Sequence, residues 1–173
     1  MKTAKEITVI GLFVALLIGG QFVLSGISGI EIVTVLIISF CFYFGVFRGV
    51  IVATAFSLLR CFIFGFFPNV IVLYLIFYNL VAIIFGLIGK AFNKSVNLKK
   101  LIIIVLLAIC LTVLFTALDL LLMMLFYSFT LKATLAYFIA GLPTLITQVI
   151  CVIVSVSCLT IPLLKVYKSI RIN

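Results

Sequence analysis

Two charged residues stand inside long apolar segments, and they are the side chains most able to do chemistry. Asp119 lies in TALDLLLMMLF (residues 116–126), and Arg60 lies in IVATAFSLLRCFIFGF (residues 51–66). A carboxylate at the centre of a membrane helix costs about 2.5–3.5 kcal/mol on insertion scales, so it needs a partner, a wet cavity or a ligand. Either the two residues form an ion pair that fixes helix packing, or at least one of them contacts a ligand; we favour ligand contact.

The composition requires a membrane as the setting for these charges. Of the 173 residues, 68% are hydrophobic and 9% are charged, against about 45–50% and 25% in soluble domains. The apolar runs are continuous rather than alternating, which excludes a β-barrel. We therefore expect an all-α membrane protein. Histidine is absent and the five cysteines show no metal-ligand spacing, which removes most hydrolase and metal-site chemistry. We expect no metal site and no cofactor.

Six apolar segments are separated by short connections rich in Gly, Pro, Asn and Lys, which are residues typical of turns. A membrane-spanning helix needs about 20 residues, and we expect one six-helix domain over residues 1–173. The first segment follows Lys2 and Lys5 and is interpreted as a retained helix rather than a cleaved signal peptide. The predicted spans are residues 7–24, 30–47, 50–67, 70–89, 101–127 and 136–164.

The net charge of +9 is explained by topology, because Lys and Arg gather in cytoplasmic loops; nucleic-acid binding is not needed to explain it. With a cytoplasmic N-terminus, the outer connections contain only Lys132, and Arg60 lies within a span. The C-terminus is then cytoplasmic as well. The basic residues on the cytoplasmic side are Lys2, Lys5, Arg48, Lys90, Lys94, Lys99, Lys100, Lys165, Lys168 and Arg171.

In this topology the strongly polar side chains gather in the outer half of the bundle, which is what a pocket open to the exterior needs. Thr112, Thr116 and Asp119 share one helix face, and Gly49, Ala53, Ser57 and Arg60 share another, as expected for faces that contact other helices. The tyrosines are equally typical of the aromatic belt at a membrane interface, and Glu31 of a solvated helix end. The candidate substrate-binding residues are Asp119, Arg60, Asn79, Tyr78, Tyr74, Gln148, Thr144, Thr116 and Glu31.

The first span carries small residues four apart, Gly11, Ala15 and Gly19. Such a ridge lets a second helix approach closely. The partner helix can belong to this chain or to another protein.

Taken together, the spans resemble a substrate-binding S component of an energy-coupling factor (ECF) transporter. The resemblance rests on GLFVALLIGG (residues 11–20), which is similar to the family's small-residue first helix, on FYFGVFRGVIVATAFSLL (residues 42–59), and on FGLIGKAF (residues 85–92). It covers the whole chain, and the order and lengths of the segments carry more of it than any single motif.

The resemblance implies a subunit of the bacterial or archaeal cytoplasmic membrane that is not itself an enzyme. Such a subunit captures a vitamin or related micronutrient from outside, in a pocket built mostly by the fourth to sixth helices. It works with a transmembrane coupling subunit and two cytoplasmic ATPases. The ridge of Gly11, Ala15 and Gly19 would contact the coupling subunit, whereas Arg60 is less typical of the family's ligand residues.

The main alternative is a membrane scaffold of the MreD cell-shape type, which has a similar length and number of spans. A scaffold predicts a protein partner and no small ligand, and it has no need of the outer polar cluster. An intramembrane enzyme is disfavoured because paired carboxylates and a serine-based constellation are missing. A channel is disfavoured because there is no ring of like charges or filter loop.

Overall fold

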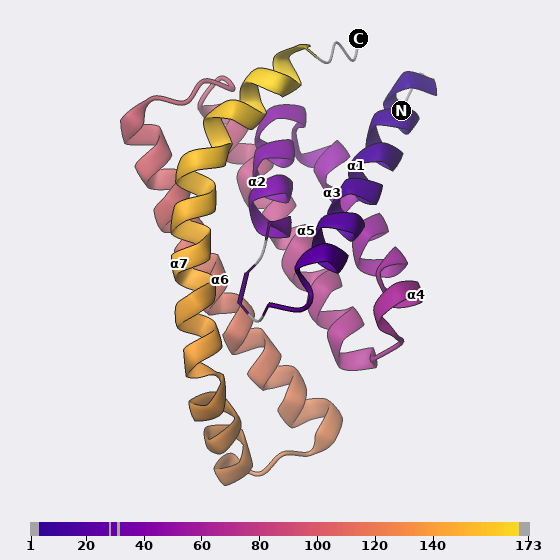
Figure 1. The fold of residues 1–173 in the computed structure, drawn as a ribbon, viewed down its shortest axis with the longest axis vertical. Coiled ribbons are helices and arrows are strands. Elements are labelled where there is room, and N and C mark those ends of the chain that lie inside the picture. Colours follow the sequence, from indigo (N-terminus) through magenta and orange to yellow (C-terminus); the bar gives the residue numbers. More distant parts are fainter. Residues whose placement is uncertain (1–3, 28, 31, 170–173) are drawn as a thin grey trace.

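The computed structural model describes residues 4–27, 29–30 and 32–169, and all regular elements in these ranges are helices (Figure 1). Glu31, which is predicted from the sequence to belong to the site, lies outside the described residues. In chain order the helices are α1 (Ala4–Leu24), α2 (Val33–Phe44), α3 (Val46–Leu59), α4 (Cys61–Phe64), α5 (Pro68–Ala91), α6 (Leu98–Tyr127) and α7 (Leu131–Ser169).

Five helical stretches among the described residues are long and apolar enough to cross a membrane, which agrees with the predicted helical membrane protein. They are α1, α5, α6, α7 and the continuous stretch Val46–Phe64 formed by α3 and α4. The second predicted span, residues 30–47, contains only the 12-residue α2. At 1.5 Å per residue α2 is about 18 Å long, short of the roughly 30 Å hydrocarbon core.

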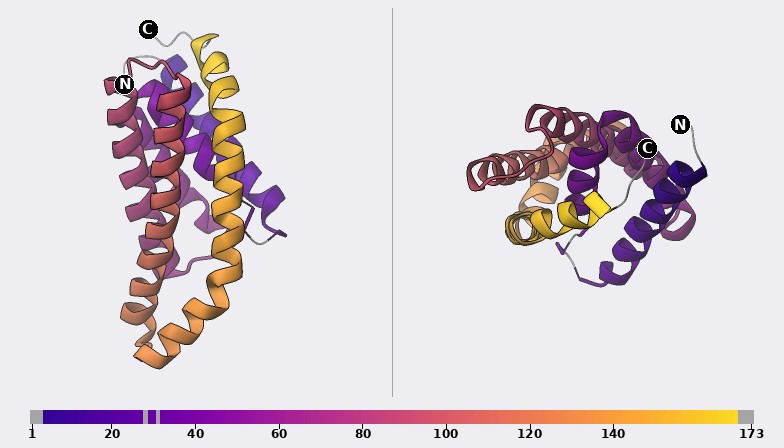
Figure 2. Two further views of the ribbon diagram at one scale, coloured as in Figure 1. Left: turned by 90° about the vertical axis from the view of Figure 1, so that its left-hand side faces the viewer. Right: turned by 90° about the horizontal axis from the view of Figure 1, so that it is seen from above.

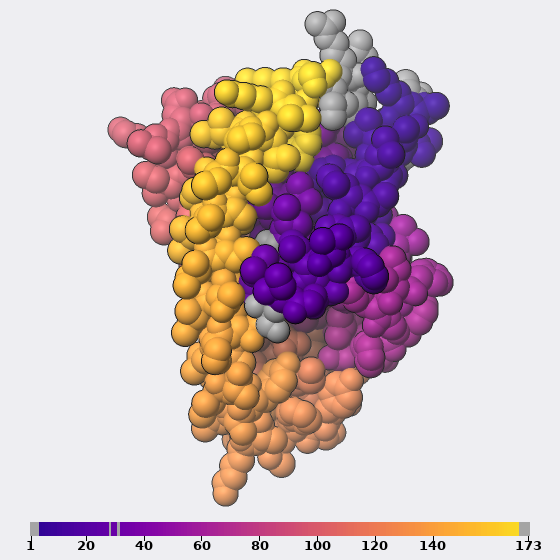
Figure 3. Space-filling view, in the orientation of Figure 1, coloured from indigo at the N-terminus to yellow at the C-terminus, as the bar shows by residue number. Residues whose placement is uncertain are grey.

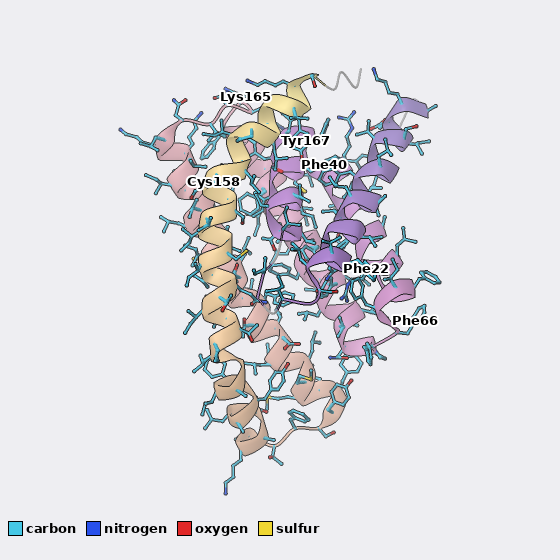
Figure 4. All side chains as sticks on the ribbon, viewed as in Figure 1. Phe22, Phe40, Phe66, Cys158, Lys165 and Tyr167 are labelled. Carbon is cyan, nitrogen blue, oxygen red and sulfur yellow. The ribbon has the colours of Figure 1, made fainter. Side chains whose placement is uncertain are left out.

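The apolar composition of α2 suits a helix that is surrounded by protein, since all but one of its residues are buried. It packs against α3, α5 and α7, and Phe40 lies beside Tyr167 of α7 with ring centroids 6.3 Å apart (Figure 4). Gly45 ends α2 and donates its N–H to the Cys41 carbonyl at 2.9 Å. Its φ of 87° is readily adopted by glycine, and α3 starts at the next residue.

Helix α1 begins and α7 ends at the same end of the molecule (Figure 1). At the opposite end the hairpin of α6 and α7 projects beyond the other helices (Figure 2). The basic connection between α5 and α6 lies at the end of the molecule where α1 begins. Lys132 lies in the first turn of α7, at the opposite end. An ion pair between Arg48 Nε and Glu6 Oε1, 2.6 Å long, ties α3 to α1 at the end where α1 begins.

The end of α1 and the segment that follows it cross the front of the bundle towards α7 (Figure 3). Gly29, with a φ of 84°, is packed so closely there that an added Cβ would lie 2.7 Å from the Cβ of Thr147. The segment therefore touches α7.

Candidate functional site: two polar cavities

The structure places Arg60 and Asp119 in separate cavities. The only salt bridge among the described residues joins Arg48 to Glu6, so the ion pair between Arg60 and Asp119 considered from the sequence is not formed. Each charged residue instead lines a cavity of its own, which we call the Arg60 cavity and the Asp119 cavity. Eight of the nine candidate residues lie in the described part of the chain. Two of the eight line the Arg60 cavity, four line the Asp119 cavity, and two line neither.

The Arg60 cavity has a volume of about 260 Å³ and lies between the end of α1, the segment after it, the α3–α4 stretch and α5. Most of its wall is apolar, and the polar groups are few. Its lining residues are Gln21, Leu24, Ser25, Ile27, Gly29, Ile30, Ile32, Val33, Arg60, Phe64 and Tyr78.

Arg60 is buried, with 8% of its surface exposed, and its side chain is held in a defined orientation. Its Nε donates to Oε1 of Gln21 at 3.1 Å, and the Nε2 of Gln21 donates to the Tyr74 hydroxyl at 3.1 Å. The guanidinium carbon lies 3.9 Å from the ring centroid of Tyr74 and 5.0 Å from that of Phe64. Rings at these distances stabilise a cation through their negative faces.

The inward direction of Arg60 follows from the helix that carries it. The Arg60 N–H donates to the Phe56 carbonyl at 3.0 Å, and the Arg60 carbonyl accepts from Phe64 N–H at 2.9 Å, so the helical path continues through Arg60. The small residues on the same face, Gly49, Ala53 and Ser57, are buried as predicted. Because that face packs on α5, Arg60 is turned inward with it.

The Asp119 cavity has a volume of about 290 Å³ and is formed by α6 and α7. The Tyr137 hydroxyl donates to Oδ2 of Asp119 at 2.9 Å. Thr116, Thr144 and Gln148, all predicted for the site, share this wall. The lining residues are Phe115, Thr116, Asp119, Leu120, Tyr137, Phe138, Ala140, Gly141, Thr144, Leu145 and Gln148.

Aromatic contacts lead from one cavity to the other. Tyr74, which stacks on Arg60, lies 6.0 Å from the ring of Phe115, and Phe77 lies 4.9 Å from the same ring. Phe115 in turn lines the Asp119 cavity. Aromatic side chains of α5 and α6 therefore stand along the path between the two charged groups.

Two of the predicted residues line neither cavity. Asn79 accepts a hydrogen bond from the Thr54 hydroxyl at 3.1 Å and donates to the Leu75 carbonyl at 2.8 Å, so it joins α5 to α3. Tyr74 lines neither cavity itself but contacts residues that do, among them Arg60, Gln21 and Phe115.

Sequence reasoning did not include Tyr137, Gln21 or Ser25 in the site. Tyr137 could have been found from spacing, because it shares one helix face with Gly141, Thr144 and Gln148 at i, i+4, i+7 and i+11. Gln21 and Ser25 enter the site because α1 ends beside Arg60, a tertiary relation with no local sequence signal.

The predicted ridge of α1 faces away from the other described helices. Gly11, Ala15 and Gly19 are exposed, and an added Cβ at either glycine would meet no described atom within 4 Å. The described helices of this chain therefore do not pack against the ridge, and it is accessible to another helix.

The two cavities have complementary binding chemistry. The Arg60 cavity offers a cation beside hydroxyls in an apolar wall, and the Asp119 cavity offers a carboxylate beside hydroxyls and an amide. Comparison of the chain with protein-family models, with curated proteins and with solved structures finds no match.

Proposed function

We propose that this protein is the substrate-binding S component of an ECF-type importer that captures a vitamin or related micronutrient from outside the cell. The observation that carries the proposal is that Arg60 and Asp119 line cavities instead of neutralising each other. A bundle that needed charges only for packing would pair them, because an unpaired charge in a membrane is costly. Cavities that expose a charge are typical of ligand binding.

The position of the cavities supports capture from the outside. Asp119 lies 21 residues after the first residue of α6, or about 32 Å along the helix axis, and Arg60 lies near the far end of the α3–α4 stretch. In the proposed topology both chain termini are cytoplasmic, because the basic connections are at their end. The short α2 is then the second of six helices, buried inside the other five.

The exposed ridge of Gly11, Ala15 and Gly19 supports a partnership with a transmembrane coupling subunit. Exposed small residues at this spacing allow close backbone approach of a second helix in a membrane, and no described helix of this chain packs against them. In this proposal two cytoplasmic ATPases bound to the coupling subunit hydrolyse ATP, and the chain contributes binding alone.

Reconstitution tests the proposal. The full chain is co-expressed with an ECF coupling subunit and its two ATPases in a bacterial host, and uptake of a panel of radiolabelled vitamins is measured. We expect uptake of one vitamin that requires both the chain and ATP hydrolysis. Uptake that is unchanged when the chain is omitted, for every vitamin, would contradict the proposal.

A further inference from the structure

We propose that the Arg60 cavity binds the carboxylate of a small organic acid, so that the substrate is an anion at neutral pH. This inference rests on the proposed function for its physiological meaning. The binding chemistry itself rests on the cavity alone.

The charge of Arg60 is not neutralised within the described part of the chain. The chain has three acidic residues. Glu6 is paired with Arg48, Asp119 bonds to Tyr137 in the other cavity, and Glu31 lies outside the described residues. Gln21 supplies Arg60 with a neutral acceptor only. A buried cation in this position is stabilised by an anion that enters the cavity.

The geometry leaves the carboxylate-binding edge of the guanidinium for a ligand. Within the described residues the guanidinium of Arg60 makes one hydrogen bond, and it uses Nε. Every fully enclosed side-chain nitrogen in the described residues has a hydrogen-bond partner, so a nitrogen without a partner is not fully enclosed. The two terminal nitrogens are therefore accessible to a small molecule, and Arg60 lines the cavity. They form part of the planar fork that matches a carboxylate with two parallel hydrogen bonds. Stacking on Tyr74 at 3.9 Å holds the guanidinium in place.

The remaining wall selects the rest of the molecule. Leu24, Ile27, Ile30, Ile32, Val33 and Phe64 make it mostly apolar, with Ser25 and Tyr78 as further polar groups. A fully hydrated inorganic anion would gain little from such a wall, whereas an acid with an apolar body would bury it. A volume of about 260 Å³ lies just below the range of 300–1,000 Å³ common for drug-sized ligands, which indicates a compact molecule.

The test uses matched acids and amides on the full chain in nanodiscs of phosphatidylcholine. The probes are nicotinate and nicotinamide, benzoate and benzamide, and biotin and biotin amide. Modification of Arg60 by p-hydroxyphenylglyoxal is followed by mass spectrometry, with Arg48 and Arg171 as internal controls. We expect at least one acid to slow modification of Arg60 about tenfold and to raise the Tm, and its amide to do neither.

Variants separate the cavity from general effects of charge or folding. Arg60→Gln should abolish the Tm shift by the acid, and Arg60→Lys should weaken binding about tenfold because the fork is lost. Lys132→Gln removes a positive charge at the same end of the molecule and should bind the acid normally. If Arg60→Gln does not fold, Ser25→Phe fills the cavity from an exposed position and should block the acid.

Several outcomes overturn the inference. These are acids that fail to protect Arg60, amides that protect it equally, or a bound acid that Arg60→Gln and Ser25→Phe still retain. Protection by phosphatidylglycerol nanodiscs alone would assign the cavity to a lipid headgroup instead. If the protein imports a neutral or cationic vitamin, and that vitamin binds to Arg60→Gln as tightly as to the unmodified protein, this inference is refuted and the proposed function stands. Binding of an acid at Arg60 without any import would refute the proposed function and leave this inference intact.

Discussion

Arg60 and Gln21 are joined by a hydrogen bond of 3.1 Å from Nε to Oε1, which ties the α3–α4 stretch to the last turn of α1. The same Gln21 amide donates to Tyr74 of α5. One side chain therefore fixes three helices around the Arg60 cavity, and it does so at the end of α1 where the chain turns across the front of the bundle.

Replacement of Gln21 should loosen this junction. Gln21→Leu removes the acceptor of Arg60 Nε and the donor to Tyr74, and an unsatisfied buried donor costs about 1–3 kcal/mol. We expect that loss in the free energy of unfolding in detergent. Thr8→Val, which removes only a local bond to Ala4 on the exposed side of α1, should change it by no more than about 0.5 kcal/mol. Equal stability of the two variants would show that Gln21 does not hold the junction.

The ion pair between Arg48 and Glu6 should stabilise the docking of α1 on α3. Its side chains are 29% and 8% exposed, so solvent screens it only in part, and hydrogen bonds to charged groups contribute about 1.5–3 kcal/mol. A double-mutant cycle with Arg48→Met and Glu6→Gln measures the coupling in thermal or denaturant unfolding. Additive effects of the two substitutions would contradict the assignment.

Two glycines should respond in opposite ways to the same substitution. An added Cβ at Gly89 of α5 overlaps the backbone carbonyl of Phe42 in α2, so Gly89→Ala should destabilise by about 1–3 kcal/mol or more. Gly11→Ala places its methyl in open space and should be neutral or stabilising by up to about 1 kcal/mol, because alanine favours helix. Similar unfolding curves for the two variants would refute the close approach of α2 and α5.

The ridge of α1 should matter for assembly and not for ligand binding. Ala15→Leu adds bulk where the proposed coupling subunit packs, so co-purification with that subunit should fall at least tenfold while ligand-induced Tm shifts are kept. Ala117→Leu makes the same change at an exposed position of α6 and should assemble normally. Assembly that survives Ala15→Leu would move the interface elsewhere.

The sequence predicted which segments are helical and which face of α3 turns inward, because small residues repeat there at helical spacing. It overestimated the second span. Residues 30–47 are mostly apolar. A helix buried in protein and a helix in lipid can have the same composition, and α2 has only 12 residues because the chain turns at Gly45 and neighbouring helices pack around it.

The relation between Arg60 and Asp119 could not be predicted from the same patterns. Helical spacing shows that each residue turns inward, but it does not show how the helices are placed around one another. Tyr74 and Phe115 stand along the path between the two charges, and Asp119 bonds to Tyr137 instead. Both facts depend on how α5, α6 and α7 pack.

Identification of a bound small molecule is the most direct test of the central claim. The full chain is purified alone from its membrane without added vitamin, denatured, and the released molecules are identified by mass spectrometry. The proposed function predicts one vitamin-sized molecule in near-stoichiometric amount that raises the Tm of the emptied protein when added back. Absence of any such molecule, together with no Tm shift by any vitamin, would contradict the claim and favour a scaffold without a small ligand.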